Sequence, residues 1–569
     1  MDASRLAPLA LGVAFHALVR RLEIDMFILP LSGVFGALGL AHLYLSVHVF
    51  GSPIPTALWA LSRGTALFAA GLAASMLLYR GLFHRLRAFP GPAAARLTKL
   101  YAVWLSARRV QWHLELQQLH ARHGDVVRTG PRELTVFRAE AVAPVAACRK
   151  STLYQLSDWS DDRLGLIETR DVEDHRRRRR PWEMALSTKA IGVYDARMQE
   201  IVGTFLSILS RSKEPVNVTE LVAYLSYDLM GAVGFGRDFG QLAGGGVEHW
   251  AVKALRAQQM FFGVLKPIPW LMNAASQIPG ADRAVAPFVD YCKGLVAEKM
   301  KTLKAEKADN SQPTDILSWI LQEYEARTPH APRTQAALDE DGRTIVVAGA
   351  DTTSNTLSNA FYYLAHHPHI YASLQSQLAQ LFPGGPSTFT YAHLSAHHAT
   401  TAPLLDAIIH ETTRLKPAVP SGTPRVTPPS GLRIPLRDAD DLFIPGDVDV
   451  YVPPYVVQRD ARYFPSPDAF VPARWLAAEQ GGRPELVAER GAWFPFQVGQ
   501  YACVGKGLAM WEMRSVLTRV ALGFDVGFPE EEGGDRGRAF DEGMRDTFTM
   551  TLGPLWLVFR ERRGEGVGR

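Results

Sequence analysis

The chain has few cysteines and no cysteine spacing that would define a disulfide framework or a zinc site. Only Cys148, Cys292 and Cys503 occur among 569 residues, and no two of them form a Cys-x-x-Cys pair. An odd, sparse and widely spaced set of thiols is typical of a protein kept in a reducing compartment. We therefore expect free cysteines, any one of which is available for chemistry.

The sequence also lacks a strong charge bias and a nucleotide-binding fingerprint. Its formal net charge is +4, with 21% charged and 47% hydrophobic residues. This composition is that of an ordinary globular protein, so charge gives no argument for nucleic-acid binding. The sequence contains no Gly-x-Gly-x-x-Gly segment, and any flavin or nicotinamide cofactor is therefore expected on another protein.

Two long apolar runs lie near the N-terminus. Residues 26–50 contain no Asp, Glu, Lys or Arg, and residues 57–79 contain one, Arg63, near their start. At about 1.5 Å per residue each run is long enough to cross a bilayer. A shorter apolar run, residues 6–19, is either a third span or a segment at the membrane surface. The alternative reading is that these runs are buried helices of a soluble core.

One cluster of arginines precedes the first long run, and a second cluster follows the second run. By the positive-inside rule both clusters face the cytosol, so the two runs form a hairpin. We therefore expect a membrane anchor over residues 1–88, with about two transmembrane helices, and a cytosolic catalytic domain over residues 89–569. The flanking residues are Arg20 and Arg21 before the first run and Arg80, Arg85 and Arg87 after the second.

The body after the anchor is dominated by helical periodicity. Residues 126–137 look like a short β-hairpin, and residues after Pro417 change to short strands and turns. The fold class that we predict is mainly α with small peripheral β-sheets. One or two helices are predicted over residues 97–122. The other predicted helices cover residues 183–211, 218–235, 249–262, 284–307, 334–366, 369–382 and 402–415, with a last helix from about residue 505.

A cysteine near the C-terminus stands at the start of that last helix. Backbone N–H groups and the helix dipole favour a thiolate there, although a buried structural cysteine is the commoner case. The surrounding residues Phe496, Gly499, Cys503 and Gly505 follow the spacing Phe-x-x-Gly-x-x-x-Cys-x-Gly. This loop resembles the haem-binding signature of the cytochrome P450 family. The family usually has Arg two positions before the cysteine, where it contacts a haem propionate, and this chain has Tyr501.

Two further segments resemble the family in the same order along the chain. Glu411 and Arg414 are three residues apart on a predicted helix, a spacing that by itself is common in solvated surface pairs. In the family such a pair is completed by an Arg from a Pro-x-Arg-Trp segment, which corresponds here to Arg474. The resemblance implies a buried Glu411–Arg414–Arg474 network that supports folding and haem retention.

The segment Ala348-Gly349-Ala350-Asp351-Thr352-Thr353 lies in the middle of a long predicted helix. Gly and Thr are poor helix formers there, and an Asp and a Thr that cap a local bend are an alternative explanation. In the family this stretch binds dioxygen over the iron, and its small residues leave room for the gas. The resemblance implies that Thr352 hydrogen-bonds the bound oxygen and that Asp351 passes protons inward.

A run of five arginines follows a histidine at residues 175–180. Nucleic-acid binding is one reading of such a run, but no aromatic platform or binding motif accompanies it. His175 and Arg179 share a helix face, and the equivalent family helix contacts the haem propionates. The resemblance implies the same role for these two residues and for Arg425. The other arginines are expected to point outward and to attract an acidic redox partner.

The resemblance covers nearly the whole chain after the anchor and implies a cytochrome P450 of the fungal, membrane-bound type. We expect haem b with Cys503 as its axial ligand, O2, and electrons from an NADPH-cytochrome P450 reductase. The substrate is expected to be lipophilic, from terpenoid or polyketide secondary metabolism, and the protein to sit in the endoplasmic reticulum membrane. Two alternatives are a haem-thiolate isomerase or dehydratase that acts without O2, and a non-catalytic haem- or lipid-binding membrane protein.

Overall fold

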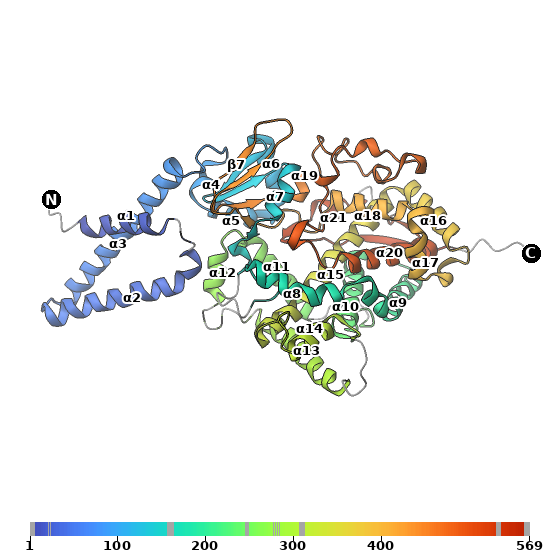
Figure 1. The fold of residues 1–569 in the computed structure, drawn as a ribbon, viewed down its shortest axis with the longest axis horizontal. Helices are drawn as coiled ribbons and strands as arrows, with labels where there is room; N and C mark the ends of the chain where they lie inside the picture. Colours follow the sequence, from blue (N-terminus) through green and yellow to red (C-terminus); the bar gives the residue numbers. More distant parts are fainter. Residues whose placement is uncertain are drawn as a thin grey trace, which may run out of the picture.

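The computed structural model describes residues 6–20, 22, 24–155, 164–244, 250–276, 278, 280, 283, 285–306, 313–530 and 536–562. A mainly helical body carries an elongated helical arm formed by the N-terminal segment (Figure 1). The described part of the C-terminal segment lies at the far end of the body from this arm. This architecture, with small sheets beside a helical core, is the fold class that the sequence predicts.

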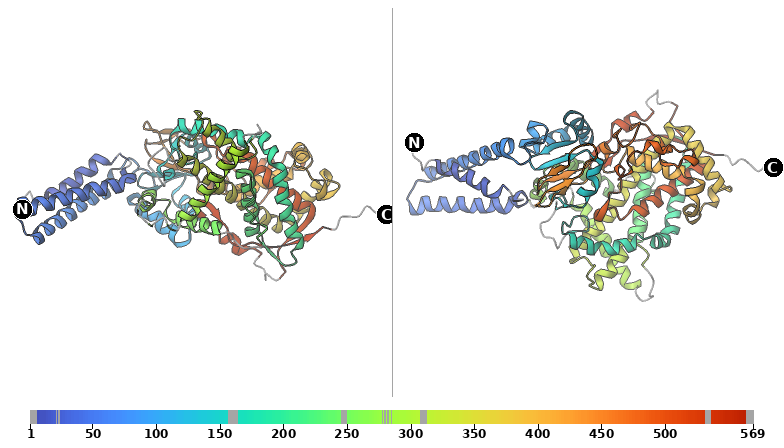
Figure 2. Two further views of the ribbon diagram at one scale, coloured as in Figure 1. Left: turned by 90° about the horizontal axis from the view of Figure 1, so that it is seen from below. Right: turned by 45° about the horizontal axis from the view of Figure 1, so that its top comes forward.

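The arm consists of helices α1 (Ala7–Val19), α2 (Ile28–Tyr44) and α3 (Ile54–Leu78) (Figure 2). Helical turns extend α2 to Val49 and α3 to Phe83, and these two extended helices are long and apolar enough to cross a membrane. Buried residues make up 0% and 6% of their most apolar stretches. Apolar surface of this extent needs a cover of lipid or of another protein.

Helix α1 packs on the second half of α3 at two glycines. A Cβ on Gly12 would lie 2.2 Å from the carbonyl oxygen of Phe68, and one on Gly71 would lie 2.1 Å from that of Leu9. His16 Nδ1 and Ser75 Oγ are 2.8 Å apart one turn further along. Residues later in α1 contact residues later in α3, so α1 runs parallel to this part of α3. Close backbone approach through small residues is the usual packing of helices in a bilayer.

The arm is joined to the body at the Pro90-Gly91-Pro92 turn. The backbone N–H of Arg128 donates to Pro90 O at 2.7 Å, and Gly91 has a φ of 153° with its α-carbon directly against Arg128. The buried guanidinium of Arg128 donates to Arg80 O at 3.1 Å and to Pro131 O at 2.8 Å. Strand β1 therefore holds the end of the α3 extension directly.

The core of the body surrounds one long central helix, α15. It begins after Thr334, whose side chain accepts a hydrogen bond from Ala337 N, and it packs against α10, α13, α18 and α20. The predicted helix 183–211 is interrupted in the structure, because Ser187 caps a new helix by accepting from Ala190 N. The body helices are α4 Ala93–Leu97, α5 Leu100–Arg109, α6 Trp112–His123, α7 Val142–Ala146, α8 Val172–Ala185, α9 Thr188–Arg211, α10 Val218–Phe235, α11 Trp250–Leu265, α12 Pro269–Ser276, α13 Ala286–Glu306, α14 Ile316–Glu325, α15 Gln335–His366, α16 Pro368–Leu381, α17 Tyr391–Thr401, α18 Leu404–Leu415, α19 Pro454–Val457, α20 Lys506–Gly523 and α21 Arg538–Glu542.

Four small sheets lie at the periphery of this core. The largest has the strand order β1-β2-β8-β5-β3, and it includes the hairpin predicted at residues 126–137. Its strands are β1 Val126–Gly130, β2 Glu133–Val136, β8 Asp449–Tyr451, β5 Arg425–Val426 and β3 Arg149–Lys150. The other sheets are β4 Val216–Asn217 with β12 Trp556–Glu561 and β9 Phe524–Gly527, β6 Leu432–Ile434 with β7 Leu442–Ile444, and β10 Arg545–Thr547 with β11 Thr549–Thr551.

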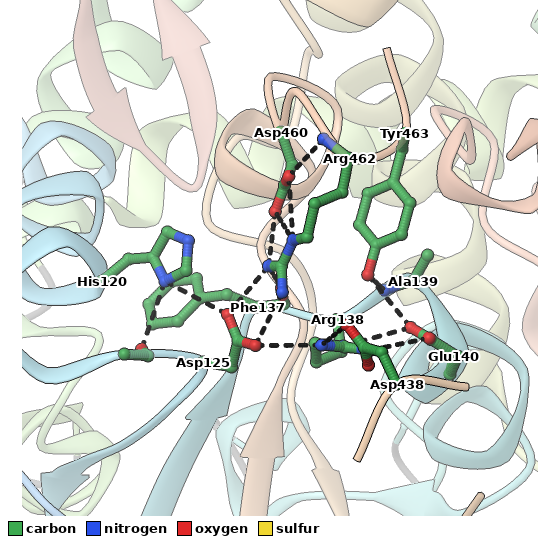
Figure 3. A network of polar contacts seen from close by, with 11 residues as sticks. His120, Asp125, Phe137, Arg138, Ala139, Glu140, Asp438, Asp460, Arg462 and Tyr463 are labelled. Carbon is green, nitrogen blue, oxygen red and sulfur yellow. Dashed lines mark hydrogen bonds and ion pairs between the residues drawn. The ribbon is translucent and has the colours of Figure 1, made fainter. Parts of the chain in front are cut away.

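A polar network fastens the open end of the β1–β2 hairpin to distant segments (Figure 3). Arg138 donates to Asp125 at 3.1 Å and to Glu140 at 2.9 Å, and it also pairs with Asp438. Arg462 donates to both carboxylate oxygens of Asp125, at 2.7 and 2.8 Å. The arginine charges hold the pKa values of Asp125 and Glu140 below their usual range. This network is structural, because it joins the hairpin to the loops at residues 438 and 462.

Candidate functional site

The cysteine loop is shaped by two residues with positive φ and by one hydrogen bond across it. Gln497 and Gly499 have φ values of 57° and 72°, and the N–H of Cys503 donates to Phe496 O at 2.8 Å. Only glycine adopts such a backbone without strain, so Gly499 is suited to its position. The turn places Cys503 two residues before the N-cap of α20, Gly505.

The sulfur of Cys503 is in an electropositive setting. Its side chain is exposed, yet desolvation by the surrounding residues raises the pKa of the thiol. Backbone N–H groups of Gly505 and Lys506 and the charge of Arg179 oppose this rise. A metal ion bound to the sulfur would remove the proton outright. The site therefore stabilises a thiolate best when a cation binds the sulfur.

Three cationic or titratable side chains surround the Tyr501 ring. Arg425 lies 4.8 Å and Lys150 5.0 Å from the ring centroid, and the His175 ring packs edge-on at 4.7 Å. Burial and the neighbouring cations lower the pKa of His175 to about 3, so its imidazole is neutral. The Tyr501 hydroxyl is buried and has no hydrogen-bond partner among the described residues. A buried phenol normally finds a partner, so this oxygen is directed at a ligand position.

Lys150 and Arg425 are direct cross-strand neighbours in the antiparallel pair β3–β5. Like charges opposite each other destabilise a sheet, and both side chains are buried. Burial and the charge of Arg425 lower the pKa of Lys150 to about 7. Within the described part of the chain neither cation forms an ion pair, and the Arg425 Nε is a buried donor without a partner. This arrangement favours binding of an anionic group between the two strands and Tyr501.

Helix α8 presents His175 and Arg179 to the cysteine loop. Its N-cap is Asp171, whose carboxylate accepts from the N–H groups of Glu173 and Asp174. Arg179 donates to Ala502 O at 2.7 Å and pairs with Glu183. The structure therefore brings His175 to Tyr501 and holds Arg179 against the backbone of the cysteine loop.

The remaining arginines of this run do not all point outward as predicted. Arg178 is buried and donates to Asp341 at 2.8 Å and to Leu164 O at 2.6 Å. Asp341 belongs to α15, so this arginine anchors α8 to the central helix. Arg176 and Arg180 are exposed, as predicted, and Arg177 is half-buried. No local signal distinguishes Arg178 from its neighbours, because its partner carboxylate lies 163 residues away.

The segment around Thr352 forms an exposed strip in the middle of the otherwise buried helix α15. Ala348 is exposed and Thr352 half-exposed, and the Thr352 hydroxyl donates to Ala348 O at 2.9 Å. The small residues of this segment do not all lie on the exposed strip. A Cβ on Gly349 would lie 2.3 Å from Met230 Sδ of α10, so this glycine accommodates helix packing. The small residue on the exposed strip is Ala348.

The Asp351 carboxylate accepts hydrogen bonds from side chains of two other helices. Tyr227 of α10 donates to its Oδ1 at 3.0 Å, and Gln259 of α11 donates to its Oδ2. Burial raises the pKa of this carboxyl, against the effects of Tyr227, Gln259 and the charge of Arg256. Sequence reasoning missed Tyr227 and Gln259, because neither belongs to a local motif.

Glu411, Arg414 and Arg474 meet in one fully buried network. Arg414 Nε and Nη2 donate to the two Glu411 oxygens at 2.8 Å each, and Arg474 Nε donates to Oε1 at 3.0 Å. Trp475 Nε1 adds a fourth side-chain bond to Glu411 at 2.9 Å. The other guanidinium nitrogens donate to backbone carbonyls between residues 458 and 486. The network therefore fixes the loops that precede the cysteine loop.

These features fit a haem group, which carries an iron for the thiolate and two propionates for the cations. Gly505 leaves space beside the sulfur: a Cβ there would lie 3.8 Å from Cys503 Sγ and meet no other non-neighbouring described atom within 4 Å. Tyr501 and Arg425 carry the unpaired buried polar atoms that propionates would satisfy. Lys150, which sequence reasoning missed, adds a positive charge at the same ring, although its ammonium already donates to Leu166 O and Ile167 O. Its two-residue strand carries no motif.

Two segments of the sequence, residues 157–166 and 260–270, are candidates for the lining of a substrate pocket. Residues 157–163 lie outside the described residues, and Leu164 and Leu166 are buried. The segment 260–270 contributes Lys266 and Pro267 to a pocket. Most of its other lining residues are apolar or aromatic, among them Ala102, Trp112, Leu153, Tyr451 and Phe548.

Comparison with known proteins relates this geometry to a family. Residues 90–539 match the family model described as Cytochrome P450. The chain is 34% identical over 508 residues to the cytochrome P450 monooxygenase orf5 of Eupenicillium brefeldianum, covering 88% of this chain and 97% of the relative. It is 33% identical over 564 residues to the cytochrome P450 monooxygenase FCK2 of Fusarium pseudograminearum (strain CS3096), covering 97% and 96%. It is 34% identical over 504 residues to the cytochrome P450 monooxygenase sthD of Phaeosphaeria nodorum (strain SN15 / ATCC MYA-4574 / FGSC 10173), covering 87% and 99%.

Proposed function

Because the chain belongs to the cytochrome P450 family, whose members are oxidoreductases, we propose that it is a haem-thiolate monooxygenase acting on a lipophilic small molecule. One oxygen atom of O2 enters the substrate, and the other leaves as water. The observation that carries the proposal is the cysteine loop, where Cys503 is two residues from Tyr501, and the Tyr501 hydroxyl and the neighbouring Arg425 Nε are buried without a partner among the described residues. A structural cysteine has no need of such donors.

In this proposal the residues of the site hold haem b at its iron and at its propionates. Cys503 binds the iron, while Tyr501, Arg425 and Lys150 bind the propionates. His175 packs against Tyr501 and fixes its ring, and Arg179 fixes the cysteine loop through Ala502 O. The bound haem supplies the activation of dioxygen, which the electron-rich thiolate promotes.

Thr352 and Asp351 supply the protons in this proposal. The Thr352 hydroxyl lies on the exposed strip of α15, where it would be able to give up its bond to Ala348 O and donate to dioxygen. Asp351, with its raised pKa, takes up a proton near neutral pH more readily than an ordinary aspartate. An isomerase or dehydratase that acts without O2 has no use for this pair.

Electrons come in this proposal from an NADPH-cytochrome P450 reductase in the same membrane. Arg176 and Arg180 are exposed on α8, the helix that contacts the cysteine loop through Arg179. Positive charge at that place suits an acidic flavoprotein surface. The buried Arg178 is not part of this docking surface.

We place the protein in the endoplasmic reticulum membrane with residues 89–569 in the cytosol. The exposed apolar sides of α2 and α3 support a bilayer anchor over residues 1–88. Arginines at the ends of α1 and α3 support the cytosolic orientation. Protease added to sealed microsomes would remove the catalytic domain if this orientation is right, and would spare it if the domain lies in the lumen.

The substrate in this proposal is a terpenoid or a polyketide of fungal secondary metabolism. The support is the pocket to which Lys266 and Pro267 contribute, where apolar and aromatic residues outnumber the polar residues Glu133, Lys266 and Ser421. The test is a panel of such compounds in microsomes that also contain the reductase, supplied with NADPH and ¹⁸O2. A product that carries one ¹⁸O atom supports a monooxygenase. A product that forms without O2 supports the isomerase, and folded protein without bound haem supports a non-catalytic membrane protein.

A further inference from the structure

The two oxygens of Asp351 have chemically different partners. The partner of Oδ1 is the Tyr227 hydroxyl, which can either donate or accept a hydrogen bond. The partner of Oδ2 is the Gln259 Nε2 amide group, which only donates. In the amide orientation of this structure, a proton on Oδ2 would therefore face another donor. Oδ1, where Tyr227 can reverse from donor to acceptor, is the oxygen better suited to take up the proton.

Tyr227 also lines a pocket between helices α10, α11, α13 and α15. Its polar lining residues are Tyr227, Gln241 and Tyr291, and the others are Phe239, Ala251, Val252, Phe288 and Val346. Polar groups on a wall of this kind can hold water by hydrogen bonds. Tyr227 thus both lines a pocket with polar groups and donates to the carboxylate.

We propose that Tyr227 is the positioning residue that loads a proton onto Asp351 Oδ1 from water in this pocket. The inference rests on the proposed function, in which Asp351 supplies protons for oxygen reduction. In the loading step the Tyr227 O–H proton moves to Asp351 Oδ1, the phenol oxygen takes one proton from a pocket water, and that water takes one proton from solvent. The net change is one proton from solvent on Oδ1; the phenol and the water are regenerated, and no electron moves. Gln259 keeps Oδ2 free of the proton.

The first test measures the protonation of Asp351 directly in the haem-loaded protein. The infrared band of its carboxylic acid is identified as the band that Asp351→Asn removes, and its intensity is followed against pH. Tyr227→Phe removes a donor to the ionised form. It should raise the midpoint by about one to two pH units, the size expected for a hydrogen bond to a charged group. Tyr224→Phe is the matched control, since Tyr224 lies one turn earlier on α10 and donates to Glu220.

The second test measures proton supply. With reductase and NADPH but without substrate, slow proton delivery releases more hydrogen peroxide for each NADPH oxidised. Asp351→Asn and Tyr227→Phe should both raise this ratio several-fold, and Tyr224→Phe should not. Gln259→Met alters a half-buried residue and should raise the infrared midpoint while leaving the peroxide ratio unchanged, because the route through Oδ1 is intact.

The outcomes separate this inference from the proposed function. If Asp351→Asn raises the peroxide ratio but Tyr227→Phe changes neither the midpoint nor the ratio, the role of Tyr227 is wrong and the monooxygenase stands. If Gln259→Met raises the ratio as much as Asp351→Asn does, the loading oxygen is not Oδ1, whether or not Tyr227→Phe folds. If Asp351→Asn itself leaves the ratio unchanged, the proposed proton route through Asp351 fails.

Discussion

Arg414 binds Glu411 through two parallel hydrogen bonds of 2.8 Å, in a position where both side chains are completely buried. Arg474 binds the same carboxylate at 3.0 Å. Two buried guanidinium groups thus depend on one negative charge. A buried pair of this kind adds little net stability over an apolar core, but the loss of one partner leaves an uncompensated charge.

Glu411→Ala should therefore destabilise the fold strongly. The expected loss is about 3–5 kcal/mol, because two guanidinium groups stay buried without their carboxylate. The measurement is chemical denaturation, together with the haem content of purified protein, which should fall. Glu485→Ala is the control, since Glu485 pairs with Arg483 on the surface and its loss should change neither quantity. Equal stability of the two variants would mean that the network is dispensable.

Two replacements of Tyr501 compare the contribution of its hydroxyl to haem binding with that of the arginine that the family usually has at this position. Tyr501→Phe should release haem roughly ten- to hundredfold faster, since it removes one donor to a charged propionate. Tyr501→Arg should not repair this loss. It places a third cation beside Lys150 and Arg425, which already lie 5.0 and 4.8 Å from the ring. Haem transfer to apomyoglobin measures the rates, and tighter binding in Tyr501→Arg would show that the existing cations do not reach the propionates.

Thr352→Ala should keep the haem spectrum but uncouple NADPH oxidation from product. The hydroxyl bonds only Ala348 O within its own helix, so its removal costs little structure. Without it the bound oxygen molecule loses a hydrogen bond and more peroxide escapes, a several-fold increase measured per NADPH. Thr356→Ala, one turn further on and bonded to Thr352 O, is the control. A similar peroxide yield from wild type and Thr352→Ala would remove Thr352 from the proposed route.

Glu512 predicts a pH dependence of stability. It is buried on α20, Ser226 donates to it, and burial raises its pKa from 4.5 to about 8. The folded state therefore binds the proton more tightly than the unfolded state. This contribution to stability is full below about pH 4.5 and is lost as the pH rises through about 8. Glu512→Gln, which imitates the protonated acid, should gain melting temperature relative to wild type between pH 6 and pH 9. Parallel melting curves across that range would contradict the shift.

Much of the fold could be predicted because helix periods and terminators are local signals. Thr334 before α15 and the apolar runs of α2 and α3 are examples. Helices α12, α14 and α17 were not predicted. The break between α8 and α9 was also missed, because a single serine, Ser187, caps a new helix inside one continuous pattern.

The site could be predicted only where a motif has fixed spacing. Cys503 and Glu411 belong to such motifs, whereas Lys150, Tyr227 and Gln259 reach the site from separate elements. Arg178 is a further example of a role that no local motif reveals. Its sequence neighbours are also arginines, and only the fold brings Asp341 next to it.

The carbon monoxide difference spectrum of the reduced protein tests the central claim most directly. Wild-type protein in microsomes should give the Soret band of a thiolate-ligated haem. Cys503→Ala should lose this band, while Cys148→Ala and Cys292→Ala, which remove the other two thiols, should keep it. Well-folded wild-type protein without the thiolate band, or a Cys503→Ala variant that retains it, would contradict the assignment of Cys503 as the iron ligand.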